Sequence, residues 1–214
     1  MKNAKKGFLH YLPMDAGRFI YWLMHGYYRF KKIGIDGKKY KNPKGPAIIV
    51  TFHKGFSDPF IMGSMFCKRR LYFLTAKEVM FNRIIETLLK AMGCIKIDRN
   101  TSDIQAIKQS VDVLKGGNLL GIFPEGGIHR DGESNKIKGG AVLIALRAGV
   151  PIIPVYTEKR SNIFKRMPVI VGENFNCADY CANKFPSVSD LSFAANELCK
   201  KMEECKSTYE QYFK

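Results

Sequence analysis

The stretch AIIVTFHKGFSDP, residues 47–59, decides the fold class, because it joins a buried strand directly to a polar loop. Its first six residues form an apolar and β-branched run, which is typical of a strand covered on both faces. The seven residues that follow include a histidine, a glycine and an aspartate. In open α/β sheets, loops at the carboxyl ends of strands carry the residues that handle ligands.

Outward from this stretch, apolar runs alternate with segments of helical periodicity. This alternation predicts a single α/β domain with a largely parallel or mixed central sheet flanked by helices. Further strands are expected at 71–75, 94–98, 119–123, 150–156 and 168–172, and helices at 78–92, 102–117, 139–149 and 189–213.

Two local patterns predict how particular elements begin. The segment KIGIDGKKY (32–40) is typical of a small hairpin, with its turn at Asp36 and Gly37. Ser102 and Gln105 resemble a capping box at the start of the second predicted helix.

The chain has a formal net charge of +16 over 214 residues, which favours an anionic partner. Residues 1–44 hold nine of these net positive charges. Residues 8–30 mix aromatic, aliphatic and basic side chains, and the apolar runs are too interrupted for a bilayer span or a signal peptide. We therefore expect residues 1–32 to form an arm of one or two short amphipathic helices on an anionic membrane surface, followed by the main domain at 33–214. The alternative is a helix packed on the domain's own core.

Six cysteines without a preceding secretory signal indicate a reducing, cytoplasmic compartment and buried thiols. Cys177, Cys181, Cys199 and Cys205 are an alternative metal-binding set. Their spacing matches no compact zinc motif, so we expect no metal.

The loop HKGFSDP raises the question of whether His53 is a base held by Asp58. Two helical residues five positions apart point about 140° away from each other. Here Gly55 permits a turn, and Ser57 predicts the cap of a helix that starts near Phe60. Such a turn brings the carboxylate back to the imidazole, where it fixes the tautomer and leaves the second ring nitrogen to accept a proton. The alternative is a polar loop after a buried strand.

Three further strand ends carry candidate residues. Arg99 is suited to clamp a phosphate, although a surface ion pair is the alternative. Glu125, Gly126 and Gly127 end another strand, where successive glycines let backbone N–H groups approach an anion or simply form a turn. The segment VPIIPV (150–155) is apolar and suits a wall.

In order and spacing, HKGFSDP, GCIKIDR, FPEGG and VPIIPV resemble the four sequence blocks of the glycerolipid acyltransferases, the 1-acylglycerol-3-phosphate acyltransferase family. The segment KGGAVLIA, between the last two, also resembles this family. The similarity covers about residues 33–172, and four ordered blocks are far more specific than any one of them.

The resemblance implies an enzyme that moves an acyl group from a thioester to the free hydroxyl of a lysophospholipid, giving phosphatidic acid. The donor is expected to be acyl-CoA or acyl-carrier protein, with no cofactor and no metal. It implies that His53 is the general base, that Asp58 orients it, that Arg99 holds the acceptor's phosphate, that Glu125, Gly126 and Gly127 line the acceptor site, that Lys138 adds positive charge, and that Pro151 and Pro154 shape the wall.

The sequence departs from the family in the third block, which usually reads F-P-E-G-T-R-S. Here Ile128 stands in place of the arginine, and Arg130 lies two positions late. Either Arg130 reaches the phosphate from a shifted turn, or the acceptor is another lysophospholipid or hydroxyl lipid. A non-catalytic protein that binds anionic lipid or nucleic acid is the third reading, but no nucleic-acid motif appears and we expect no nucleic acid as a partner. We expect a peripheral enzyme on the cytoplasmic face of the membrane.

Overall fold

The computed structural model describes residues 8–98, 103–125, 137, 139–158, 162, 164–181 and 186–213. Their strands form one seven-stranded sheet in the order β1-β7-β6-β2-β5-β3-β4, which confirms the predicted α/β class. The strands are β1 (Lys31–Gly34), β2 (Ala47–Val50), β3 (Leu71–Ala76), β4 (Cys94–Ile97), β5 (Leu119–Ile122), β6 (Ile152–Thr157) and β7 (Pro168–Val171). The helices are α1 (Phe8–Tyr28), α2 (Asp58–Met65), α3 (Arg83–Ala91), α4 (Ile104–Lys115), α5 (Gly140–Ala148) and α6 (Val188–Phe213), with 3₁₀ turns η1 (Lys77–Val79) and η2 (Cys177–Asp179).

The sheet is mixed, and its parallel part positions the site. Strands β6, β2, β5, β3 and β4 all run parallel to one another. Strand β7 runs antiparallel to β6, and β1 runs parallel to β7. The carboxyl ends of the five parallel strands therefore meet at one edge of the sheet, which we call the carboxyl edge.

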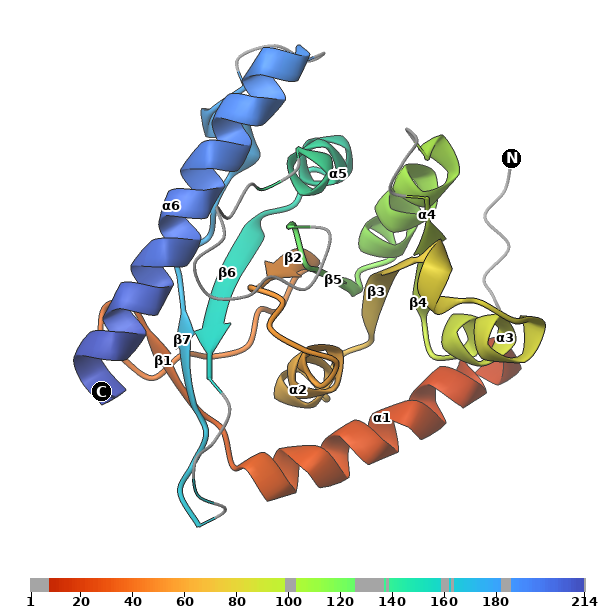
Figure 1. Cartoon of the computed structure of the whole chain (residues 1–214), viewed down its shortest axis with the longest axis horizontal. Helices are drawn as coiled ribbons and strands as arrows, with labels where there is room; N and C mark the ends of the chain where they lie inside the picture. The colour runs from red at the N-terminus through yellow and green to blue at the C-terminus, as the bar shows by residue number, and fades with distance from the viewer. Residues whose placement is uncertain are drawn as a thin grey trace.

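Helices cover both faces of the sheet. Helices α4, α5 and α6 lie on one face, whereas α2 and α3 lie on the other, with α1 crossing beneath them as an outer layer (Figure 1). In β2, the side chains of Ile48 and Val50 belong to the hydrophobic core on the side of α4, α5 and α6. Those of Ala47 and Ile49 belong to the core on the side of α2. All four are at most 1% exposed, as expected for a strand covered on both faces.

Helix α1 is one continuous helix that packs on the domain and also presents an apolar face to solvent. Asp15 accepts hydrogen bonds from Arg18 and Arg70, at 2.9 and 2.7 Å, which ties α1 to the start of β3. Gly63 of α2 lies against Tyr21, so closely that a Cβ there would come within 2.6 Å of the ring. On its outer face, large apolar side chains are about half exposed or more: Leu12, Phe19, Ile20, Trp22, Leu23 and Tyr27.

Helix α1 therefore packs on the core, as the alternative interpretation of the N-terminal segment expects. It also keeps an exposed aromatic face, which a membrane-surface helix requires. In the part of the chain that is described, no helix combines the length and apolarity needed to cross a bilayer.

The structure corrects the boundaries of three predicted helices. The helix expected at 78–92 begins only at Arg83, because Asn82 has an extended backbone and its side chain caps Ile85 at 2.8 Å. The next helix is capped by Asp103 rather than Ser102, which lies outside the described residues. The helix after β2 begins at Asp58, two residues earlier than expected, and Ser57 makes no side-chain capping bond.

The predicted hairpin at 32–40 is reduced to a tight turn. A single antiparallel bridge joins Ile33 to Lys39. The main partner of β1 is instead β7, with Lys31 opposite Pro168. Local turn residues therefore gave the bend correctly but not the strand pairing.

Candidate active site

The carboxyl edge brings together four segments that are distant in the sequence. His53 follows β2, Glu125 follows β5, Asp98 follows β4, and Glu158 follows β6. Because β2 lies between β6 and β5 in the sheet, His53 lies between the ends of β6 and β5. The edge is therefore the place where the predicted chemistry can assemble.

His53 and Asp58 are in contact, as the predicted turn requires. The imidazole Nδ1 lies 3.1 Å from Oδ2 of Asp58. The same carboxylate oxygen accepts backbone N–H groups from Lys54 at 2.6 Å and Gly55 at 2.8 Å. The Asp58 N–H in turn donates to the carbonyl of Gly55 at 3.1 Å. Three donors thus converge on one oxygen and hold the carboxylate beside the ring.

The surroundings keep the Asp58 carboxylate charged. Burial by itself raises the pKa of Asp58, but hydrogen bonds from His53 and from the N–H groups of Gly55 and Lys54 outweigh it, and the net pKa is lowered. An ionised carboxylate can only accept a hydrogen bond, so the facing Nδ1 of His53 carries the proton and donates it in that bond. The tautomer assigned in this way leaves Nε2 as the ring nitrogen able to accept a proton.

Glu125 and Phe123, which both follow β5, hold the main chain and the ring of His53. The backbone N–H of His53 donates to Oε2 of Glu125 at 3.0 Å, and the Glu125 side chain is buried, with 6% exposure. The His53 ring stacks on Phe123 at a centroid distance of 4.3 Å. The main chain, ring plane and tautomer of the histidine are therefore each held by a separate contact.

A second polar network adjoins the histidine on the β6 side. Lys54 Nζ donates to the hydroxyl of Tyr156 at 2.7 Å, and that hydroxyl donates to Glu158 at 2.9 Å. Burial raises the pKa of Tyr156, and the hydrogen bond to Glu158 raises it further. No local sequence pattern singles out Lys54, Tyr156 and Glu158 as one network beside the histidine. Their adjacency depends on the pairing of β2 with β6, which no local pattern reveals.

The remaining predicted residues divide into those that the structure describes and those that it does not. Pro154 lies in β6 opposite Val50 of β2, so the predicted apolar wall adjoins the strand that leads to His53. Asp98, the residue before the predicted Arg99, accepts a hydrogen bond from Lys77 Nζ at 2.5 Å. The other predicted substrate-binding residues lie outside the described part of the chain: Arg99, Gly126, Gly127, Arg130 and Lys138.

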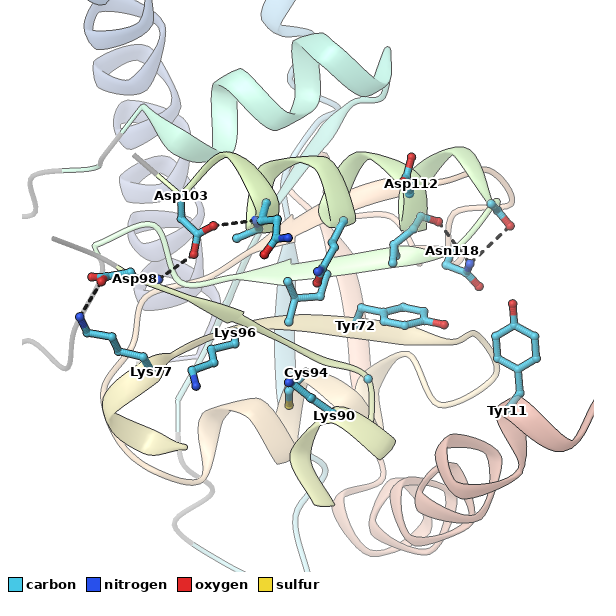
Figure 2. A pocket seen from close by; sticks show the side chains of 17 residues that line it. Tyr11, Tyr72, Lys77, Lys90, Cys94, Lys96, Asp98, Asp103, Asp112 and Asn118 are labelled. Carbon is cyan, nitrogen blue, oxygen red and sulfur yellow. Dashed lines mark hydrogen bonds and ion pairs between the residues drawn. The ribbon is translucent and has the colours of Figure 1, made fainter. Parts of the chain in front are cut away.

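A cavity of about 1010 Å³ runs along the sheet's outer edge at β4, and neither His53 nor Asp58 lines it. Figure 2 shows Tyr11 and Tyr72 at one end and Lys77 and Asp98 at the other. The cavity thus borders the carboxyl edge without enclosing the dyad.

Three cysteines of the possible metal-binding set are buried thiols. Burial raises the pKa of Cys177 and Cys205 to about 12, and Cys181 is also buried. Among the residues with described positions, no three His, Cys, Asp or Glu side chains gather as metal ligands.

The chain is similar in sequence to known proteins. Residues 32–158 match the family model described as Acyltransferase. A 1-acyl-sn-glycerol-3-phosphate acyltransferase of Bacillus subtilis is 28% identical over 169 residues, which cover 77% of this chain and 83% of that protein. The enzyme of the same name from Streptococcus pneumoniae is 38% identical over 109 residues, covering 50% of this chain and 40% of that protein.

The fold has a counterpart among solved structures. The crystal structure of the 1-acyl-sn-glycerophosphate (LPA) acyltransferase PlsC from Thermotoga maritima superposes with a TM-score of 0.60 at 15% identity. The superposition covers 94% of this chain and 80% of that one. At this identity the likeness concerns the fold.

Proposed function

The chain belongs to the acyltransferase family, and on that premise we propose that it transfers a fatty acyl group from a thioester to the free hydroxyl of 1-acylglycerol-3-phosphate, forming phosphatidic acid. The names of its relatives in Bacillus subtilis and Streptococcus pneumoniae support this acceptor. The observation that carries the proposal is the contact between Asp58 Oδ2 and His53 Nδ1, because it leaves Nε2 available as a base.

In the proposed reaction, Nε2 of His53 takes the proton of the acceptor hydroxyl while the hydroxyl oxygen attacks the carbonyl carbon of the thioester. The resulting tetrahedral intermediate collapses with cleavage of the C–S bond. The proton on Nε2 then passes to the departing thiolate, so the products are an ester and a free thiol. Asp58 stabilises the imidazolium that exists between these steps.

We assign Glu125 a positioning role in this reaction. Its carboxylate accepts the backbone N–H of His53 just beyond the last β2–β5 pair, Val50 with Ile122. A hydrogen bond to a charged acceptor is stronger than a neutral one, so it restrains the loop that carries the base. This role adds to the lining of the acceptor site that the family resemblance implies.

The acceptor's phosphate is proposed to bind the basic and glycine-rich residues that the resemblance supplies. Arginine is suited to this task, because its guanidinium offers a planar pair of donors to a phosphate. These residues are Arg99, Gly126, Gly127, Arg130 and Lys138. Because Ile128 replaces the family arginine, a lysophospholipid with a different head group is the second candidate acceptor.

The exposed face of α1 supports contact with an anionic membrane, where a lysophospholipid is dissolved. Phe19, Trp22 and Tyr27 are each more than half exposed on this face, and aromatic side chains favour the membrane–water interface. We propose that residues 1–32 act as this arm and that the enzyme is peripheral, on the cytoplasmic face. The thioester donor is proposed to be acyl-CoA or acyl-carrier protein.

The test is thiol release from a long-chain acyl thioester in anionic vesicles that contain 1-acylglycerol-3-phosphate. We expect release to depend on the acceptor and to fall by about a hundredfold or more in His53→Ala and Asp58→Asn. Asp112→Asn, on the exposed side of α4, is the matched control and should keep full activity. Activity of His53→Ala near the wild-type rate would reject the proposed base.

A further inference from the structure

A second apolar surface lies on α3 and the loop before it. Phe81 is 76% exposed, Ile84 80% and Leu88 54%. Ile84 and Leu88 stand one turn apart on the same side of α3, and Phe81 precedes its cap. We call these three residues the α3 patch. Single exposed apolar residues are ordinary, but three large ones within residues 81–88 indicate a surface that contacts a partner.

The one acidic side chain of α3, Glu86, is paired with lysines. Glu86 binds Lys90 of its own helix at 2.7 Å and Lys96 of β4 at 3.2 Å. The acidic group of the helix is thus directed to the sheet and neutralised by two lysines. No residue of α3 is fully buried. Ile85 and Leu89 turn partly toward the domain, whereas Ile84 and Leu88 remain exposed, so part of the apolar side of α3 faces outward.

The helix that carries the α3 patch packs beside α1. Helix α1 passes beside α3, and both lie on the same face of the sheet (Figure 1). Met92, just after α3, lies against Gly17 of α1, since a Cβ at Gly17 would come within 3.8 Å of its Cε. The amino-terminal end of α3 follows β3 and so lies toward the carboxyl edge, where His53 is held.

We propose that the α3 patch is a second membrane-contact element, which binds an anionic bilayer together with α1 and holds the carboxyl edge against the lipid head groups. This inference rests on the proposed function, which requires a lipid acceptor. We infer an anionic lipid as the partner because Arg83 and Lys90 flank the patch, Glu86 is already paired with lysines, and the chain carries a net charge of +16.

Two separate contacts with the bilayer do more than one. A single amphipathic helix leaves the domain free to pivot about the helix axis, so the distance of His53 from the surface would vary. A second contact at α3 fixes the rotation about that axis. The acceptor hydroxyl then meets the base at a defined depth, since interfacial helices insert by about 5–10 Å.

The direct test uses tryptophan as a depth probe, because Trp22 is the chain's single tryptophan. Trp22→Phe is combined with Ile84→Trp, and the matched control combines it with Ile104→Trp. Ile104 is 71% exposed on α4, on the opposite face of the sheet. With anionic vesicles of brominated lipid, we expect a blue shift and strong quenching at position 84 and neither at position 104. No quenching at position 84, while Trp22 of the unmodified protein is quenched, would overturn the inference.

A second test measures affinity and activity separately. Phe81→Ser combined with Ile84→Ser should weaken binding to anionic vesicles by on the order of tenfold, because two large apolar side chains no longer insert. The control combines Ile104→Ser with Val188→Ser, because both residues are well exposed on the face of the sheet opposite α3. This control should bind vesicles like the wild type. Unchanged vesicle binding by the Phe81/Ile84 variant would contradict the inference.

Activity distinguishes this inference from the proposed function. The Phe81/Ile84 variant should turn over a short-chain, monomeric acceptor like the wild type and lose rate only on vesicle-embedded acceptor. Loss on both acceptors with normal vesicle binding would show that the patch serves the chemistry and not docking. If the wild type acylates no acceptor, the proposed function fails, and quenching at position 84 still decides the membrane contact.

Discussion

Replacement of Glu125 separates a positioning role from a role in binding the acceptor. Its buried carboxylate accepts the backbone N–H of His53 at 3.0 Å. A hydrogen bond to a charged group contributes about 1.5–3 kcal/mol. If that energy restrains the base, Glu125→Met should lower kcat by roughly 10- to 150-fold, since about 1.4 kcal/mol corresponds to a factor of ten. Glu125→Gln keeps an oxygen acceptor without the charge and should lose roughly 3- to 10-fold.

The assay is acceptor-dependent thiol release, with the acceptor varied at saturating donor. A positioning role predicts a lower kcat with the KM for the acceptor little changed, and partial recovery in Glu125→Gln. Circular dichroism and thermal unfolding of both variants check that the fold is retained. A raised acceptor KM with kcat unchanged would refute the positioning role and favour direct contact with the acceptor. Equal losses in the two variants would also contradict it, because only methionine removes the acceptor oxygen.

Three further predictions concern the docking of α1 and its exposed face. The hydrogen bond from Arg70, opposed by partial burial and helped by Arg18, lowers the pKa of Asp15 from its ordinary value of 3.8 to about 2. The stability that the ionised Asp15 contributes is therefore present above pH 3.8 and lost as the pH falls toward 2, and urea unfolding of Asp15→Asn should show a shallower decline over that range. Gly63→Ala should destabilise the fold by about 1–3 kcal/mol through its clash with Tyr21, whereas Gly45→Ala, with nothing within 4 Å of the new Cβ, should cost little; equal effects in chemical denaturation would contradict the packing described. Trp22 emission should shift to the blue with anionic vesicles and less with zwitterionic ones, and an unchanged spectrum with both would exclude α1 as a membrane contact.

Much of the fold followed from local patterns. The run at 47–52 predicted a strand buried on both faces, and its first four residues form β2 in that environment. The predicted helix from Ser189 to Phe213 appears as α6, from Val188 to Phe213. Apolar periodicity is reliable in such elements, because burial in the folded chain imposes it on the sequence.

Boundaries and pairings were less predictable, because they depend on backbone geometry and distant partners. The apolar period extends back to residue 78, yet α3 begins only at Arg83, because the backbone of Asn82 is extended. Glycine and aspartate at the turn after β1 predicted a hairpin, but the neighbour that β1 gained is β7, more than a hundred residues later in the chain. Strand pairing of this kind is set by packing and not by turn residues.

The candidate site was predictable in part for the same reasons. The contact of Asp58 with His53 is local and was expected from Gly55 and the start of α2. The hydrogen bond from His53 to Glu125 and the network of Lys54, Tyr156 and Glu158 required knowledge of which strands flank β2. A sequence block shows that a glutamate follows a strand, but the direction of its side chain is a property of the folded sheet.

The most direct test of the central claim is the identity of the acylated product. Wild-type protein and His53→Ala should be incubated with anionic vesicles, 1-acylglycerol-3-phosphate and an isotope-labelled acyl thioester, and the lipids analysed by mass spectrometry. We expect labelled phosphatidic acid from the wild type and almost none from the variant. Thiol release without a labelled lipid ester, or equal product from both proteins, would contradict acyl transfer with His53 as the base.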